Sequence, residues 1–167
     1  MNPFVVIALG SNLGDSRGTV LAAMERLRPR ASGEWLRSSL YESSPVDCPP
    51  ASPRFINAVV AFVPLSSDTP EGLLDWMLEL EKKQGRLPKK VLNDARPLDM
   101  DLIAFGDVTI STQKLVLPHP RAARRRFVLE PMAEILPNFV FPGSVTCVSE
   151  MLRDLPADGT VMRLADS

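Results

Sequence analysis

The stretch Arg96-Pro-Leu-Asp-Met-Asp-Leu-Ile-Ala-Phe105 has the alternation of a β-strand, with Asp99 and Asp101 placed between apolar residues. Side chains two residues apart project from the same face of a strand, about 7 Å apart along the backbone. Asp is disfavoured inside strands, so two of them on one face suggest a functional placement. Paired carboxylates can bind hard cations such as Mg²⁺, which usually arrives with substrate phosphates. The alternative is an edge strand with a solvated polar face, and this short pattern alone leaves both interpretations open.

Outward from this strand, apolar runs and turn residues predict the order strand-helix-strand-strand-helix-strand. The predicted strands cover 4–9, 34–42, 55–63 and 96–105, the predicted helices cover about 15–27 and 70–85, and 109–116 and 121–136 add a strand segment and a helix that Pro131 restarts or bends. This order predicts an α+β fold, the ferredoxin-like α/β sandwich with a split βαβ core, an antiparallel sheet and C-terminal additions. One face of such a sheet carries helices, and the other is left for a site or for extra elements.

Length and composition predict a single domain over residues 1–167. The chain is 45% hydrophobic and 23% charged, which is ordinary for a globular protein large enough to bury a core. It has no run of about 18 apolar residues that could span a membrane, and its first residues lack the basic segment of a signal peptide. Cys48 and Cys147 are far apart and outside any ligand motif, so we expect free thiols and a cytoplasmic location.

The charge is unevenly distributed. A net charge of −1 argues against a general nucleic-acid binder. Between Val108 and Leu129, however, there is no acidic residue, and the basic residues there are Lys114, Arg121, Arg124, Arg125 and Arg126. This segment suits a small anionic ligand, although for an isolated basic cluster a solvated surface or a helix cap is the favoured interpretation.

A second basic group precedes the Asp strand and strengthens the case for a phosphate site. It consists of Arg86, Lys89, Lys90 and Arg96. Arginine presents forked donors to phosphate oxygens and keeps its charge. Carboxylates for metal ions beside such arginines are the components that phosphoryl transfer needs, because that chemistry depends mainly on positioning and charge neutralisation.

Other polar positions are compatible with either a ligand or a structural role. Asn57 lies inside an apolar strand on the same face as Phe55, an arrangement that could read and stack a planar heterocycle or could serve internal hydrogen bonds. His119, the only histidine, could contact phosphate or stabilise its turn. The segment Gly10-Ser-Asn-Leu-Gly14 lacks P-loop spacing, so a tight turn that caps a helix is the favoured interpretation.

Together these motifs resemble the 6-hydroxymethyl-7,8-dihydropterin pyrophosphokinase family of folate biosynthesis. The resemblance covers nearly the whole chain in order, through ALGSNLGD, YESSPV, FINAVVAF, ELEKKQGR, RPLDMDLIAFGD, LVLPHPRAARRRFVLEPMAEI and PNFVFP. It implies a ferredoxin-like fold and transfer of the β,γ-pyrophosphoryl unit of ATP to the pterin hydroxymethyl oxygen, with release of AMP.

The resemblance also implies roles for individual residues. Asp99 and Asp101 would hold two Mg²⁺ ions with ATP, and Arg86 and Arg96 would be the catalytic arginines of a closing loop. The implied pterin-binding residues are Ser43, Ser44, Val46, Phe55, Asn57, Asn93 and Phe127. The implied ATP-binding residues are Glu81, Leu102, Lys114, His119 and Arg125.

The chain departs from the family pattern at several of its positions. Pro88 replaces a loop arginine, Asn93 a tryptophan and Lys114 an arginine; Ser43, Asp47 and Leu78 also differ. These changes bear on turnover and loop closure more than on reaction type. They also keep open a homologue that binds nucleotide or pterin without transfer. A ferredoxin-like RNA-binding module is disfavoured, because the strands lack clustered aromatic residues. We expect ATP and the pterin as partners, no nucleic acid or membrane, and a monomer.

Overall fold

The computed structural model describes residues 2–44, 54–83, 97–156 and 161–164, and its centre is an antiparallel sheet. The sheet order is β5-β1-β4-β3-β8, and β2 also pairs with β4. The strands are β1 (Val5–Ser11), β2 (Ala31–Arg37), β3 (Tyr41–Ser43), β4 (Phe55–Pro64), β5 (Asp99–Phe105) and β8 (Val161–Arg163). A separate two-stranded sheet contains β6 (Ile110–Ser111) and β7 (Val116–Leu117).

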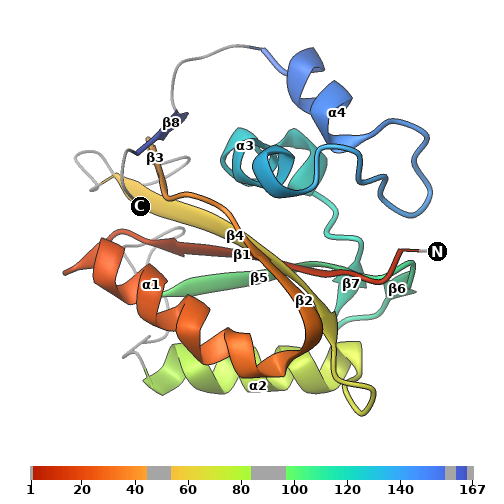
Figure 1. Cartoon of the computed structure of the whole chain (residues 1–167), viewed down its shortest axis with the longest axis horizontal. Helices are drawn as coiled ribbons and strands as arrows, with labels where there is room; N and C mark the ends of the chain where they lie inside the picture. The colour runs from red at the N-terminus through yellow and green to blue at the C-terminus, as the bar shows by residue number, and fades with distance from the viewer. Residues whose placement is uncertain (1, 45–53, 84–96, 157–160, 165–167) are drawn as a thin grey trace.

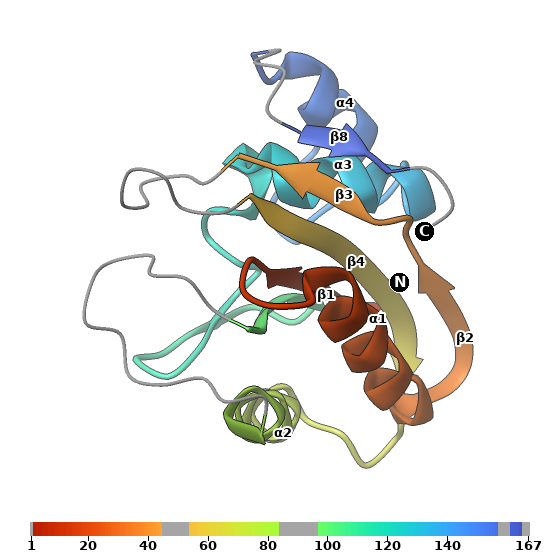
Figure 2. The same cartoon turned by 90° about the vertical axis from the view of Figure 1, so that its left-hand side faces the viewer.

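Helices cover both faces of the sheet (Figures 1 and 2). The helices α1 (Ser16–Leu27) and α2 (Pro70–Lys83) lie on one face, and α3 (Arg126–Ile135) and α4 (Val148–Asp154) lie on the other. Short 3₁₀ helices occupy Arg28–Arg30 and Ala122–Arg124. This α+β architecture confirms the predicted ferredoxin-like order of elements, and α3 and α4 are the extra elements on the second face.

The alternation of β1 explains why the sheet has two cores. Val5, Ile7 and Leu9 pack with α1 and α2 in one buried cluster, whereas Val6 and Ala8 pack with α3 and α4 in another. The seven residues of β1 are all buried, as expected for a central strand covered on both sides. The predicted apolar stripes of α1 and α2 point into the first core through Val20, Met24, Leu27, Leu73, Met77 and Leu80.

The single strand predicted at 34–42 is wrong, because the structure divides it into β2 and β3. Three residues separate Arg37 from Tyr41, whereas two separate their partners Val60 and Asn57 on β4, so the β2–β3 side carries one extra residue. Ser38 fills the interruption: its N–H donates to the Val59 carbonyl at 2.9 Å, and its hydroxyl accepts from the Val59 N–H at 2.9 Å. At the bulge, the Ser38 hydroxyl thus takes the place of a backbone carbonyl as the acceptor for the Val59 N–H.

Two other predictions need smaller corrections. The helix predicted over 121–136 begins as a 3₁₀ turn, and α3 itself starts at Arg126, with Pro131 buried inside it rather than restarting it. The strand structure expected at 109–116 is the β6–β7 hairpin. Among the described residues, no helix has both the length and the apolar character needed to cross a membrane.

Candidate functional site

A row of paired residues crosses the sheet and brings the predicted amide and carboxylate to one face. Asn57 on β4 pairs with Gly10 on β1, and Gly10 pairs with Asp99 on β5. Asp101 pairs with Ala8 in the same ladder. Directly paired residues share a face of an antiparallel sheet, and adjacent strands are about 4.8 Å apart, so Asn57 and Asp99 lie roughly 10 Å apart across Gly10. Asn57 and Asp99 are far apart in the sequence but lie in the same cross-strand row.

The two carboxylates fit a Mg²⁺ site completed by a substrate. Asp99 and Asp101 are half-buried, while the intervening Met100 is buried in the opposite core, as the alternation predicts. Within the described residues, no group of three or more His, Cys, Asp or Glu side chains could hold a metal by itself. Mg²⁺ commonly takes one or two carboxylates and completes its shell with water and phosphate oxygens, so this donor set suits it.

A pocket of about 200 Å³ opens beside Asp101. It is lined by Leu74 of α2, Leu102 of β5 and Val116 of β7, together with Lys114 and His119. Met100 N–H donates to Glu81 Oε2 at 2.6 Å and therefore points away from β1. Backbone groups alternate along a strand, so the Leu102 N–H shares that outward direction, toward the pocket. An apolar pocket with a few polar groups is the usual form of a small-molecule site.

His119 presents a neutral N–H group to this pocket. Its Nδ1 accepts from the Arg121 backbone N–H at 3.2 Å, so the ring proton of the neutral form belongs on Nε2. Burial, together with the nearby charges of Arg125 and Arg121, lowers the pKa of His119 to about 4, while Asp99 acts in the opposite direction. His119 is therefore neutral at physiological pH and can donate through Nε2.

The other residues expected to contact ATP differ in accessibility. Glu81 is buried, and its Oε2 accepts from the Met100 N–H of β5. Lys114 Nζ lies 2.8 Å from Asp75 Oδ1 of α2, and both side chains are more than half exposed. Arg125 lies with Nη1 3.8 Å from Asp101 Oδ2 and with its guanidinium 5.5 Å from the Phe127 ring centroid. Arg125 therefore contacts both Asp101 and the Phe127 ring.

The part of the site expected to bind pterin is buried and hydrogen-bonded. Asn57 is 4% exposed and Ser43 is 3% exposed. Asn57 Nδ2 donates to Ser43 Oγ at 2.6 Å. Phe55 is half-buried near them, and Ser44 Oγ accepts from Arg54 at 3.2 Å. The Ser43 contact orients the amide of Asn57, so that its carbonyl oxygen faces the side of Gly10.

Gly10 is a site residue whose role the sequence did not indicate. A Cβ atom at this position would lie 3.4 Å from Asn57 Oδ1 and 3.6 Å from Phe55 Cδ1. Because Gly10 has no side chain, only backbone lies between Asn57 and Asp99 in this row. Helix capping belongs further along: the Asp15 carboxylate accepts from Gly18 N–H at the start of α1, which supports the turn-and-cap interpretation over a phosphate loop.

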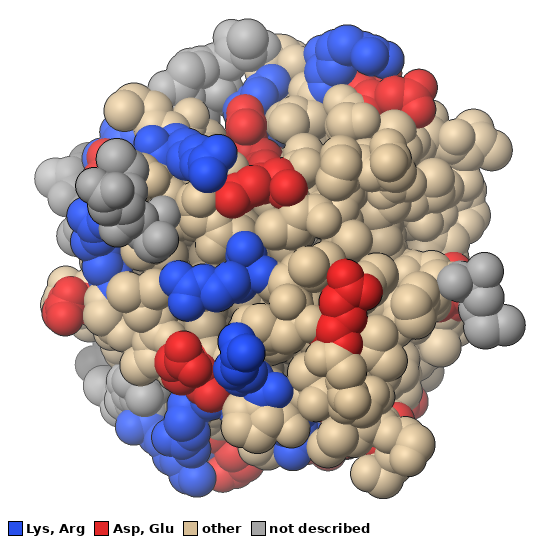
Figure 3. Space-filling view, in the orientation of Figure 1, with Lys and Arg blue, Asp and Glu red and all other residues tan. Residues whose placement is uncertain are grey.

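Four of the predicted site residues lie outside the described part of the chain. They are Val46, Arg86, Asn93 and Arg96. On the face drawn in Figure 3, Lys and Arg side chains are interspersed with Asp and Glu rather than gathered into one broad basic surface.

Known proteins resemble this chain over most of its length. Residues 6–137 match the family model described as 7,8-dihydro-6-hydroxymethylpterin-pyrophosphokinase. The 2-amino-4-hydroxy-6-hydroxymethyldihydropteridine pyrophosphokinase of Pseudomonas aeruginosa is 33% identical over 93% of this chain and 93% of its own length. The protein of the same name from Bacillus subtilis is 36% identical over 81% of this chain and 79% of its own length.

Longer relatives contain a matching region as one part of a larger chain. The folate synthesis bifunctional protein of Arabidopsis thaliana is 36% identical over 79% of this chain, which spans 27% of that relative. The crystal structure of HPPK-DHPS from Plasmodium falciparum with SDX-DHP has a TM-score of 0.70 and 13% identity, over 92% of this chain and 44% of that one. The structural likeness supports the fold, and the sequence matches identify the chain as a member of the 7,8-dihydro-6-hydroxymethylpterin-pyrophosphokinase family.

Proposed function

We propose that this chain transfers the β,γ-pyrophosphoryl unit of ATP to the hydroxymethyl oxygen of 6-hydroxymethyl-7,8-dihydropterin and releases AMP, as a step of folate biosynthesis. The observation that carries the proposal is the row Asn57–Gly10–Asp99, which sets an amide and a carboxylate on one face of the sheet. A spacing of about 10 Å suits a pterin ring at one end and a triphosphate at the other. The named activities of the relatives point to the same reaction.

Asp99 and Asp101 would hold Mg²⁺ together with the triphosphate. The bound cation would neutralise the charge of the phosphates that are transferred and released. The neutral His119 would donate a hydrogen bond through Nε2, and Lys114 and Arg125 would supply positive charge near Asp101. These groups orient the phosphates and balance their charge, which is the main catalytic requirement of phosphoryl transfer.

Asn57 and Ser43 would orient the pterin so that its hydroxymethyl group points toward Asp99. The amide offers both a donor and an acceptor to the edge of the heterocycle, and Phe127 offers a ring face for stacking. The hydroxymethyl oxygen forms a bond to the β-phosphorus, the bond from that phosphorus to the bridging oxygen of AMP breaks, and the hydroxyl proton passes to solvent. Because all these groups come from one chain, we propose a monomer, and we place it in the cytoplasm.

The decisive experiment is nucleotide analysis after incubation of the protein with ATP, Mg²⁺ and the pterin. AMP should form only when pterin is present, and formation should stop in Asp99→Asn and Asp101→Asn variants. ADP in place of AMP would contradict pyrophosphoryl transfer. Binding of ATP and pterin without AMP would instead indicate a homologue that has kept the site and lost the reaction.

A further inference from the structure

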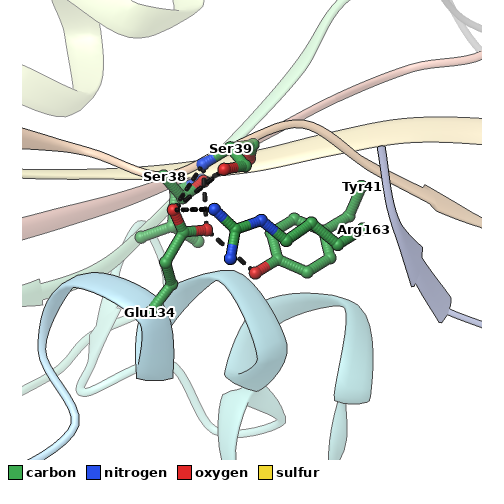
Figure 4. Close-up of polar contacts among 6 residues, drawn as sticks. Ser38, Ser39, Tyr41, Glu134 and Arg163 are labelled. Carbon is green, nitrogen blue, oxygen red and sulfur yellow. Dashed lines mark hydrogen bonds and ion pairs between the residues drawn. The ribbon is translucent and has the colours of Figure 1, made fainter. Parts of the chain in front are cut away.

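A carboxylate on α3, outside the site described above, connects several segments beside the pterin side of the sheet. Glu134 Oε1 accepts from the Tyr41 hydroxyl at 2.8 Å and from the Ser39 N–H at 2.9 Å. Its Oε2 accepts from the Ser39 hydroxyl at 2.9 Å and lies 3.5 Å from Arg163 Nη2. Figure 4 shows these groups converging on Glu134 from the β2–β3 bulge, from β3 and from the C-terminal strand β8.

The cross-sheet register connects this cluster to the candidate site. Arg163 on β8 pairs with Tyr41 on β3, and Tyr41 pairs with Asn57 on β4. The row that contains Asn57, Gly10 and Asp99 therefore continues through Tyr41 to Arg163. Ser43, the residue that orients the Asn57 amide, lies two residues after Tyr41 on the same face of the same short strand.

The position of β3 depends on contacts from three sides. It has only three residues, paired with β4 along one edge and with β8 along the other. The Leu164 N–H extends the second edge by donating to the Leu40 carbonyl at 2.9 Å. Immediately before β3, the bulge interrupts regular pairing with β4. The Tyr41–Glu134 bond adds the third side, because it fixes β3 against α3.

We infer that Glu134 and Tyr41 are positioning residues for the pterin pocket: their hydrogen bond, clamped by Arg163 of β8, sets where β3 holds Ser43 against Asn57. This inference rests on the proposed function, since it assigns the pterin to the Asn57 end of the row. Loss of the bond leaves the side chains of Ser43 and Asn57 intact but releases β3 relative to β4.

Tyr41 is suited to act as a permanent donor in this arrangement. Its side chain is 5% exposed, and burial, followed by the bond to Glu134, raises the pKa of its hydroxyl above the usual value. The phenol therefore stays protonated through the neutral range, and Tyr41→Phe removes the donor while the ring keeps its place in the core.

The test compares Tyr41→Phe with a matched loss at the opposite end of β4. Arg30 donates to Asp68 at 2.9 Å near the Pro64 end, with the side chains 24% and 10% exposed, so Asp68→Ala removes a part-buried polar contact far from Asn57. For Tyr41→Phe we expect the Kd of the pterin, measured by calorimetry, to rise about three- to tenfold, with the Kd of ATP within about twofold of wild type. For Asp68→Ala we expect neither Kd to change by more than that.

A second readout does not depend on ligand. The side-chain amide resonances of Asn57 in ¹H–¹⁵N spectra of the free protein should shift in Tyr41→Phe and stay in place in Asp68→Ala. Arg163 is mostly exposed, so Arg163→Ala should still fold. It should shift the Asn57 amide resonances in the same direction as Tyr41→Phe but by less, and Arg163→Lys should restore their wild-type positions.

The outcomes separate the two proposals. The positioning role would be overturned if Tyr41→Phe left both the Asn57 resonances and the Kd of the pterin unchanged. It would also be overturned if Tyr41→Phe raised the Kd of ATP as much as that of the pterin, or if Asp68→Ala raised the Kd of the pterin as much as Tyr41→Phe. A wild-type protein that does not bind pterin would overturn the proposed function and the pterin role with it, whereas the Asn57 resonances would still report the contact between the two strands.

Discussion

The two halves of the site differ in how completely the protein assembles them before a ligand arrives. On the pterin side, Asn57 and Ser43 are nearly inaccessible and joined at 2.6 Å. On the nucleotide side, Lys114 and Asp75 are mostly exposed, and Arg125 lies 3.8 Å from Asp101. A buried bond between neutral groups is rigid and specific, while exposed ion pairs are weak and exchange readily.

This difference suits the two proposed substrates. A flat heterocycle is recognised by a donor and acceptor pattern that must be oriented in advance, since an unpaired buried amide is costly. A triphosphate is recognised by charge, and its counter-charges can move to meet it. We therefore expect changes on the pterin side to affect recognition sharply and changes on the nucleotide side to affect it gradually, with the carboxylates between them essential to both.

The largest effect is expected at those carboxylates. Asp99→Asn or Asp101→Asn should lower kcat at least about 100-fold, because each variant removes an anionic ligand for Mg²⁺ at the phosphates. AMP formation as a function of Mg²⁺ concentration is the measurement. Glu79→Gln removes an exposed carboxylate that pairs only with Lys82 at 3.4 Å among the contacts described, and it should leave the rate unchanged. A rate near wild type in the Asp variants would show that the two halves do not meet at this strand.

The next effect tests the rigid half. Gly10→Ala places a methyl group between Asn57 and Phe55, at 3.4 and 3.6 Å. These are ordinary contact distances, so the variant should fold. The methyl group nevertheless lies directly beside the Asn57 amide. We expect the Kd of the pterin to rise about tenfold with little change for ATP, which corresponds to about 1.4 kcal/mol of lost binding. Calorimetry measures the Kd of each ligand. An equal rise in the Kd of ATP would mean that Gly10 lies beside both ligands.

A pH titration sharpens the comparison on the nucleotide side. The folded pKa of His119, about 4, lies below the unfolded value of 6.5, so between those values the unfolded chain binds more protons. Stability should therefore be fully present above about pH 6.5 and decline as the pH falls toward 4. Denaturant unfolding across this range should show a shallower decline in His119→Gln. As the only histidine, His119 also gives one unambiguous NMR titration, and a midpoint near 6.5 would contradict a buried neutral ring.

Local patterns predicted the rigid framework well. The apolar run of β1, the helix predicted over about 70–85 and the alternation around Asp99 depend on residues close in sequence, and the structure confirms each element. The bulge before β3 could not be predicted in this way, because Ser38 makes its decisive hydrogen bonds to Val59, 21 residues away.

The same limit applies to the site. The alternation of β5 indicated the carboxylate pair, but the orientation of Asn57 depends on Ser43 across the strand pair, and the role of Gly10 depends on what lies opposite it. The three-residue strand β8 has too few residues to show a period, and its pairing with β3 depends on contacts distant in the sequence. Register, rather than residue type, decides these features.

The smallest effect is expected for the exposed pair on the nucleotide side. Lys114→Ala removes a cation at the pocket and its 2.8 Å contact with Asp75. An exposed ion pair contributes about 0–1 kcal/mol, so the free energy of unfolding should change little, while the Kd of ATP should rise about three- to fivefold and more at low salt than at high salt. Lys82→Ala is the matched control, because Lys82 forms an exposed pair with Glu79 in the last turn of α2, the helix that carries Asp75, and it should change neither. If Lys114→Ala raised the Kd of the pterin as much as the Kd of ATP, the Lys114 cation would act on both sides of Asp101. The site would then behave as one preformed unit rather than as a rigid half and an adaptable half.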